Sequence, residues 1–300
     1  MFDIEKVNAR VFLTVAETGS FRKAADRLGY TQAGISYIVS TMEEAMGLVL
    51  FLRERGGVRL SPEGQELLPL MKQWEAWERQ LRQTVDEVRG LEKGSLRIQI
   101  FDSISIHWIP GIIKKFQDDF PGVSIELISA ENGDAARQLI ANGEVDCGFL
   151  IASEEADLDI LPLHEDPLLA CVGIEHPLAQ AEVFPLARLA DYPYISMKYD
   201  DHTGIRSIFR KNGVKADTAF YLDNDFAALA MVAKGLGFGI FPELLLKDVP
   251  YELHAMPFDR PLSRTICIAT RSLETCSRAC RKFMEYTQEW VKQEYHQQER

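Results

Sequence analysis

The stretch FLTVAETGSFRKAADRLGYTQAGISYIVSTMEEAMGLVLFLRERGGVRLSPEG, residues 12–64, contains the patterns that decide the fold of the amino-terminal part. Its centre predicts two short helices, each with a polar cap at its start and a glycine at its end. Ser20 and Gly29 bracket the first helix, and Thr31 and Gly47 bracket the second. Two short helices joined by a brief turn around a glycine predict a helix-turn-helix unit.

The second of these helices has two chemically different faces, and a further helix is predicted before the unit, over residues 4–16. Apolar positions expected to be buried are Ile35, Ile38, Val39, Met42 and Met46. The opposite face carries Gln32, Ala33, Ser36, Tyr37 and Ser40. In a helix-turn-helix the second helix enters the major groove, where Gln reads an adenine edge and hydroxyls bond to bases or phosphates. This face is therefore the candidate DNA-reading surface.

A predicted hairpin follows the second helix. LVLFL (48–52) and VRLS (58–61) are expected strands around a glycine-containing tip. Its three arginines, Arg53, Arg55 and Arg59, suit contact with phosphates or a minor groove. Small three-helix units with a hairpin also occur in proteins that bind no DNA. On these residues alone both interpretations stay open.

Charge is distributed unevenly along the 300 residues. The 33 Lys and Arg against 45 Asp and Glu give a net charge of −12, but residues 1–60 carry 8 basic and 7 acidic side chains, whereas residues 91–300 carry 21 and 32. The total excludes a protein that coats nucleic acid along its whole length. It leaves a DNA-binding amino-terminal segment open. With 46% hydrophobic and 26% charged residues, the chain is expected to fold into sizeable cores.

Cellular location and cysteine chemistry follow from simple absences in the sequence. No apolar run approaches the roughly 20 residues that span a bilayer, and the start MFDIEKVNAR resembles no secretory signal. We therefore expect a cytoplasmic protein without a membrane partner. The five cysteines are widely spaced and form no Cys-x-x-Cys pair, so reduced structural thiols are expected, with no metal and no cofactor.

Residues 61–92 predict one long helix that links two parts of the chain. Ser61 is its expected N-cap, Pro62 occupies the first helical position, and Pro69 is expected to bend the helix or limit its start. Apolar residues at a 4-3 spacing predict a dimerisation seam: Leu67, Met71, Trp74, Leu81, Val85 and Val88. The alternative is packing of this stripe on the same subunit's core, because Trp77 widens the apolar face.

Residues 93–300 alternate short apolar strands with amphipathic helices. This order predicts parallel sheets, in two small α/β lobes. Lobe I is expected over about 93–162 and 266–300, and lobe II over about 163–265. Ligands of such folds bind at the carboxyl ends of strands and between lobes.

These motifs resemble the LysR family of bacterial transcriptional regulators. The specific elements are SFRKAADRL and the LF-x-R-x-x-x-G-V-x-L-S-x-x-G pattern in residues 12–64, joined by GSLRI (94–98), WIPGIIKKFQDDFPGVSIEL (108–127) and GLGFGIFPE (235–243). The resemblance implies an α/β protein with a winged helix-turn-helix DNA-binding domain (1–60), a dimerisation helix (61–92) and a periplasmic-binding-protein-like effector domain (93–300). Ala33-Gly34 and Ser36-Tyr37 depart from the family's usual recognition helix, which bears on base preference.

The resemblance implies a sequence-specific transcription regulator, not an enzyme. Its implied partners are an inverted-repeat operator in double-stranded DNA, a small-molecule effector, RNA polymerase, and copies of itself in a dimer or tetramer. The implied DNA-binding residues are Ser20, Arg22, Thr31, Gln32, Ala33, Ser36, Tyr37, Ser40, Arg53, Arg55 and Arg59.

By the same resemblance, an effector is expected at the cleft between the lobes. The implied effector-binding residues are Ser103, Ser105, Phe149, Ile151, His202, Thr203, Arg206, Asn224 and Asp225. Serine hydroxyls, helix N-termini and Arg206 suit an organic anion, with Phe101, Trp108 and Phe149 as an apolar wall.

Two other classes of function are weaker. The six His are scattered and match no catalytic or zinc-binding motif, which disfavours an enzyme. A redox-sensing regulator of the same fold would use Cys147, near the expected cleft, or Cys276 and Cys280, one helical turn apart. Buried thiols that fill small gaps are the simpler interpretation.

Overall fold

The computed structural model describes residues 3–88, 94–152, 157–197, 205, 209, 213 and 217–296. The chain divides into two compact units, one centred on the first 90 residues and the other on the remainder. Among the described helices, none is long and apolar enough to cross a membrane.

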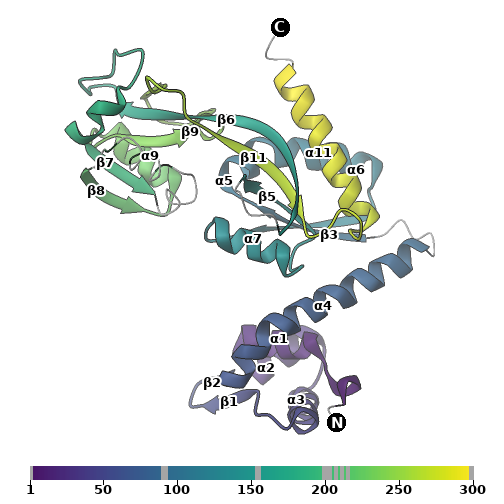
Figure 1. Cartoon of the computed structure of the whole chain (residues 1–300). Coiled ribbons are helices and arrows are strands. Elements are labelled where there is room, and N and C mark those ends of the chain that lie inside the picture. The colour runs from purple at the N-terminus through teal and green to yellow at the C-terminus, as the bar shows by residue number, and fades with distance from the viewer. Residues whose placement is uncertain are drawn as a thin grey trace. The chain divides into compact units, whose positions relative to one another are not determined.

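The first unit begins as a winged helix-turn-helix (Figure 1). Its elements are a 3-10 turn Ile4–Lys6, α1 Ala9–Thr18, α2 Phe21–Leu28, α3 Gln32–Met46, β1 Phe51–Glu54 and β2 Gly57–Leu60. The predicted start of the first helix is wrong. The Asn8 side chain accepts a hydrogen bond from the Val11 N–H, so the regular helix begins at Ala9 rather than at residue 4.

Caps and glycines end the helices of this unit where the sequence predicts. Ser20 and Thr31 accept hydrogen bonds from backbone N–H groups in the first turns of α2 and α3. Gly29 and Gly47 close the same helices in left-handed conformations, with φ of +72° and +67°. The core of this unit is formed by buried residues of the three helices, of the hairpin region and of the linker helix that follows it: Ala9, Val11, Phe12, Val15, Ala24, Ala25, Ile35, Val39, Met42, Leu50, Phe51 and Met71. Ile38 and Met46 are only partly buried against it.

The hairpin is held against the helices by a contact between two glycines. Gly57 has a φ of +154°, and a Cβ there would lie 2.2 Å from the carbonyl oxygen of Gly19. The next residue, Val58, donates its N–H to that same oxygen at 2.8 Å. The end of α1 therefore fixes the position of the wing.

The linker helix α4, Pro62–Val88, begins at the buried Ser61. The Ser61 Oγ donates to the Val49 carbonyl at 2.6 Å and accepts from the Gly64 N–H at 2.9 Å, so one hydroxyl joins the helix start to the hairpin. Pro69 lies inside the helix without ending it.

The predicted seam of α4 divides into two parts. The winged helix-turn-helix and the start of α4 are called the head below. Met71 is buried in the core of the head, and Leu67 and Trp74 pack partly against that core. Met71 therefore packs within its own subunit. Leu81 is 65% exposed and Val85 is 39% exposed; the side chain of Val88 lies outside the described residues. Leu70 and Trp77 are also exposed apolar side chains of this helix.

The second unit has a mixed sheet, not the parallel sheets that the sequence predicts (Figure 1). Its strands are β3 Gly94–Ile100, β4 Val123–Ser129, β5 Cys147–Ile151, β6 Asp159–Gly173, β9 Gly239–Pro242, β10 Leu253–Met256 and β11 Ser263–Thr270. β3 pairs in parallel with β4 and β5, whereas β11 runs antiparallel to β5 and β6. β9 and β10 pair with the far half of β6. The long strand β6 is thus shared by both lobes.

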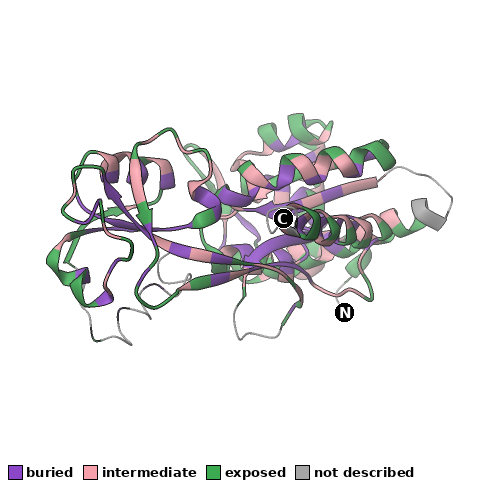
Figure 2. Cartoon of the chain, turned by 90° about the horizontal axis from the view of Figure 1, so that it is seen from above, coloured by how far each residue is buried: buried purple, intermediate pink, exposed green. Residues whose placement is uncertain are grey.

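Helices flank these strands, and β7 Pro193–Met197 pairs in parallel with β8 Asp217–Leu222. The remaining helices are α5 Asp102–His107, α6 Ile109–Asp119, α7 Gly133–Ala141, a 3-10 helix Leu186–Asp191, α9 Asp225–Ala233, α10 Glu243–Leu246 and α11 Arg278–His296. Trp108 and Phe149 lie in the core of lobe I, while Phe184 and Phe238 lie in that of lobe II. Buried residues follow the strands, and the helices turn exposed faces outward (Figure 2).

Candidate functional site

The first candidate site is the outward face of α3. Gln32, Ala33 and Ser40 are exposed on it, Ser36 is half-buried, and Tyr37 is 73% exposed. These positions lie on one side of the helix because the buried Ile35, Val39 and Met42 occupy the other. The face combines an amide, hydroxyls and a phenol, which are groups that contact base edges and phosphates.

Two of the predicted DNA-binding residues, Thr31 and Ser20, also cap helices. Thr31 Oγ1 accepts the Gly34 N–H at 3.0 Å, and a Cβ on Gly34 would lie 3.2 Å from that oxygen. Ser20 caps α2 through the Lys23 N–H at 3.4 Å. The close approach of the Thr31 cap gives a local reason for glycine at position 34 inside the helix, which the sequence alone does not reveal. Arg22 is exposed in the first turn of α2.

The three arginines of the wing have different surroundings. The Arg53 guanidinium lies 5.8 Å from the centre of the Phe21 ring, a cation–π contact that positions it. Arg59 forms an ion pair with Glu54 on the facing strand. Arg55 is exposed at the tip and has no ion-pair partner among the described residues. Arg55 is thus the wing cation that offers most to a phosphate.

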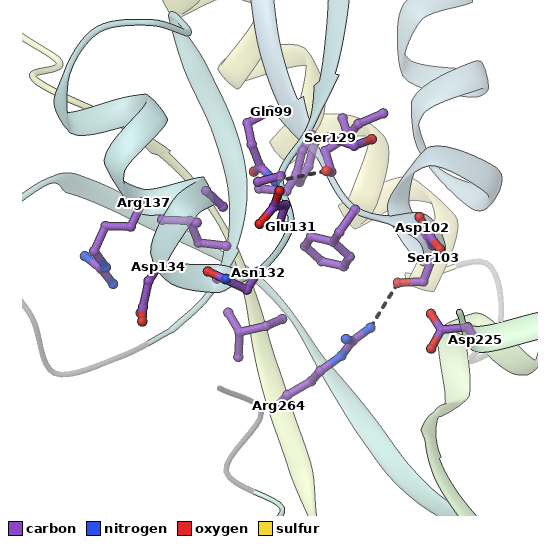
Figure 3. Close-up of a pocket in the computed structure, with 18 of the residues that line it drawn as sticks. Gln99, Asp102, Ser103, Ser129, Glu131, Asn132, Asp134, Arg137, Asp225 and Arg264 are labelled. Atoms are coloured by element: carbon purple, nitrogen blue, oxygen red, sulfur yellow. Dashed lines mark hydrogen bonds between the residues drawn. The ribbon is translucent and has the colours of Figure 1, made fainter. Parts of the chain in front are cut away.

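The second candidate site is a cavity of about 410 Å³ in the second unit (Figure 3). It is lined by the carboxyl ends of β3, β4 and β5, the starts of α5, α7 and α9, and parts of β9, α10 and β11. Its polar lining residues are Gln99, Asp102, Ser103, Ser129, Glu131, Asn132, Asp134, Arg137, Asp223, Asp225 and Arg264. Its size is that of a small-ligand pocket.

The structure brings four of the predicted effector residues to this cavity and not two others. Ser103, Phe149, Ile151 and Asp225 line it. Ser105 does not; its Oγ donates to the Asp102 carbonyl at 2.8 Å. Asn224 accepts the Ala227 N–H at 2.8 Å as the cap of α9, Trp108 is buried in the lobe I core while Phe101 lines the cavity, and His202, Thr203 and Arg206 lie outside the described residues.

A buried ion pair that the sequence does not indicate lies at the edge of the cavity, which its arginine lines. Arg264 on β11 donates to Asp166 on β6 at 2.9 Å through Nε and lies 2.8 Å from it through Nη2. The same guanidinium donates to Ser103 Oγ at 3.0 Å, and Asp166 accepts the Leu244 N–H at 2.9 Å. One ion pair thus joins α5, α10 and the two strands shared by the lobes. Its one sequence signal is a charged residue at the start of the apolar strand RTICIAT.

The thiols give little support to a redox-sensing site. All five cysteines are free, and all but the half-buried Cys276 are buried. A hydrogen bond with Cys280, together with burial, raises the pKa of Cys276. A hydrogen bond with Cys147 and burial raise the pKa of Cys280, and burial raises the pKa of Cys171. Since the thiolate is the reactive form, raised pKa values make these thiols poor nucleophiles. Within the described part of the chain, no cluster of side chains is arranged to hold a metal ion.

A winged helix-turn-helix and a two-lobed α/β domain with a cavity define a class, the DNA-binding regulators with a separate ligand-binding domain. Comparison with known proteins supplies the family. Residues 8–65 match the model of the bacterial regulatory helix-turn-helix protein, lysR family, and residues 89–292 match the LysR substrate binding domain. The chain belongs to the LysR family of transcriptional regulators.

Relatives match over most of their length. The uncharacterized HTH-type transcriptional regulator YvbU of Bacillus subtilis is 27% identical, over 93% of this chain and 96% of that protein. The HTH-type transcriptional activator CmpR of Synechocystis is also 27% identical, over 92% of each chain. Among solved structures, full-length CbnR in complex with its target DNA aligns with a TM-score of 0.69 at 18% identity, covering 96% of this chain and all 100% of that one. A full-length OxyR variant from Pseudomonas aeruginosa aligns with a TM-score of 0.72 at 19% identity, covering 97% and 95%.

Proposed function

We propose that the protein is a cytoplasmic, dimeric, non-enzymatic regulator that binds an inverted-repeat operator through α3 and the wing, and whose promoter activity changes when a small molecule occupies the cavity. The observation that carries the proposal is that two candidate binding surfaces lie in separate compact units. The exposed polar face of α3 and the wing arginines belong to the first compact unit, while a cavity of about 410 Å³ lies in the second. The same proposal includes contact with RNA polymerase and assembly of two dimers into a tetramer.

Recognition of DNA is assigned to α3 in the major groove. Gln32, Ser36 and Tyr37 would contact base edges, because they share the face that the core leaves uncovered. Arg53 and Arg55 would contact phosphates from the wing, which contributes affinity without sequence information. Ala33 and Ser40 complete the same surface, and Arg22 extends it along α2.

Dimerisation is assigned to the exposed apolar side chains of α4. Leu70, Trp77, Leu81 and Val85 are separated by seven, four and four residues, a spacing that keeps them near one stripe of a helix. Val88 would continue the stripe. The Met71 part of the predicted seam already packs on the head, so the proposed interface uses the neighbouring, exposed side chains. Two linked heads would reach half-sites roughly 34 Å apart.

The test is selection of bound sequences from random duplex DNA, followed by fluorescence anisotropy of the selected duplex at several salt concentrations. We expect affinity to fall steeply with salt, because phosphate contacts release counterions. Gln32→Ala should relax sequence preference, whereas Lys292→Ala, an exposed lysine on α11, should change nothing. Failure to enrich any sequence, or association that salt does not weaken, would contradict the proposal.

A further inference from the structure

Arg53 on β1 of the wing is held by an aromatic ring and not by a carboxylate. Its guanidinium carbon lies 5.8 Å from the centre of the Phe21 ring, at the start of α2. No carboxylate forms an ion pair with Arg53 in the part of the chain that the structure describes. A carboxylate would engage N–H donors of the guanidinium and compensate its charge, whereas a ring contact leaves both available. Arg53 is therefore positioned and still able to bind an anion.

The register of the hairpin separates Arg53 from the acidic side chain of the wing. Side chains alternate between the two faces of a strand, and Arg53 is paired with Val58 on the facing strand. Phe51, Arg53 and Val58 therefore share one face, and Phe51 and Val58 pack in the core of the head. Glu54 belongs to the opposite face, where it forms an ion pair with Arg59. The wing thus neutralises Arg59 and leaves the charge of Arg53 uncompensated.

A series of aromatic rings connects the Arg53 contact to the core of the head. Phe12 and Phe51 are buried, with ring centres 5.2 Å apart. The half-buried Phe21 ring lies 6.2 Å from that of Phe51, at an interplanar angle of 71°. The wing therefore lies against α2 (Figure 1). Because packing on the core fixes the Phe21 ring, its contact with Arg53 restricts the rotamers of the arginine before any ligand binds.

A second uncompensated arginine follows Phe21 directly in the sequence. Arg22 is exposed in the first turn of α2, and none of the described carboxylates forms an ion pair with it. Arg27, in the last turn of the same helix, is instead paired with Glu17 at 2.8 Å. Positive charge is therefore left available at the start of α2 and is neutralised at its end. Of the expected partners, the phosphates of duplex DNA are the anions that this arrangement fits.

We propose that Phe21 is a positioning residue of the DNA interface, whose ring holds Arg53 ready for a backbone phosphate of duplex DNA. The inference rests on the proposed function, because it assumes that the wing contacts DNA. Arg53 then binds its phosphate with part of its side-chain freedom already lost, which strengthens the complex without an additional contact. Arg55, at the tip, has neither a ring nor a carboxylate against it among the described side chains, so its ordering occurs only on binding.

Double-mutant cycles in the full-length protein test the inference. Fluorescence anisotropy is measured on the selected duplex and on an unrelated duplex of equal length, at several salt concentrations. Phe21→Leu should weaken binding by about two- to fivefold, which corresponds to one exposed cation–π contact. The slope of log affinity against log salt should not change, because the phosphate contacts remain. Phe21→Leu should have no further effect in the Arg53→Ala background and its full effect in the Arg55→Ala background.

Matched substitutions separate positioning from stability. Arg53→Lys and Arg55→Lys remove the same planar group and keep the charge, so both leave the salt slope unchanged. Arg53→Lys should weaken binding more, because only Arg53 loses a contact with a ring. Phe220→Leu replaces a partly exposed ring of the second unit and should leave DNA affinity unchanged. Thermal melts verify the folding of each variant, and the two lysine variants, at exposed positions, decide the matter if Phe21→Leu unfolds.

The outcomes distinguish this inference from the proposed function. An equal effect of Phe21→Leu with and without Arg53, no effect on affinity, or the same loss with Phe220→Leu overturns the role of Phe21 and leaves DNA binding intact. Equal losses with Arg53→Lys and Arg55→Lys do the same. If the cycles behave as expected on the unrelated duplex but selection enriches no sequence, the proposed function is refuted and the role of Phe21 stands. A protein that binds no duplex refutes both.

Discussion

The wing of the amino-terminal head and the cavity of the second unit both contain arginines, yet they use them in opposite ways. At the wing, Arg55 is exposed and without an ion-pair partner among the described residues. At the cavity, Arg264 is buried and held by Asp166, while several carboxylates face the space. The net charge of −12 describes neither surface. The two sites therefore differ in whether their arginines are already engaged by carboxylates of the chain.

The largest expected effect is on the buried arginine. Arg264→Ala should destabilise the second unit by about 3–5 kcal/mol, because Asp166 would remain buried without its counter-ion. Urea unfolding followed by tryptophan fluorescence measures this loss. Lys282→Ala breaks an exposed ion pair with Glu285 and should leave the midpoint almost unchanged. Equal effects of the two substitutions would refute the contrast between a buried and an exposed ion pair.

The next effect concerns the position of the wing. Gly57→Ala should destabilise the head by about 1–3 kcal/mol, since φ of +154° is strained for alanine and its Cβ would clash with the Gly19 carbonyl. DNA affinity should fall with it. Gly56→Ala is the matched control, because a Cβ at Gly56 has no neighbour within 4 Å. Unfolding midpoints and anisotropy of both variants decide the matter, and a neutral Gly57→Ala would show that the wing is not fixed by this contact.

An intermediate effect is expected at the exposed stripe of α4. Leu81→Glu should weaken self-association by at least about tenfold, because it places a charge in an apolar interface. Sedimentation velocity across a dilution series measures it. Gln73→Glu, an exposed position on the same helix, should retain the wild-type association state. If Leu81→Glu sediments as the wild type does, the assigned dimer interface is wrong.

The smallest expected effect is at the wing tip. Arg55→Ala should reduce the slope of log affinity against log salt by about one and weaken all DNA sequences alike, with no loss of stability. Arg59→Ala should change the slope less, because Arg59 is engaged by Glu54. Anisotropy titrations at four salt concentrations distinguish the two variants. A larger effect at Arg59 would mean that the ion pair opens when DNA binds.

Signals between neighbouring residues predict the elements of the head. Contacts between residues far apart in the sequence leave no such local signal. Ser20, Thr31, Gly29 and Gly47 specify helix ends within a few residues, and the structure has caps at each of them. The exception is the start of α1, where the Asn8 cap overrides the apolar periodicity over residues 4–16. In such short elements the decisive interactions are all close in sequence.

The second unit was predicted less completely because its deciding contacts join residues far apart. Arg264 and Asp166 are separated by 98 positions, and nothing local to either indicates the other. Pro162, Pro167 and the charged run between them interrupt the apolar pattern in the first half of β6, so the sequence does not indicate a strand there. The predicted effector residues that line the cavity lie at strand ends and helix starts, where topology alone places them.

The use of α11 in the core of lobe I has a consequence for the order of events during synthesis. Cys280, Phe283 and Met284 of α11 share a core with Leu96 and Ile98 of β3, so this lobe closes only after nearly the whole chain has been made. The head, by contrast, is complete by Met71, with all its core residues close in sequence. Domains fold as they leave the ribosome, amino-terminal part first. A nascent chain therefore has a folded α3 well before its ligand-binding unit has folded. Control of DNA binding by a ligand requires the nearly complete chain, because residues of α11 complete the core of lobe I.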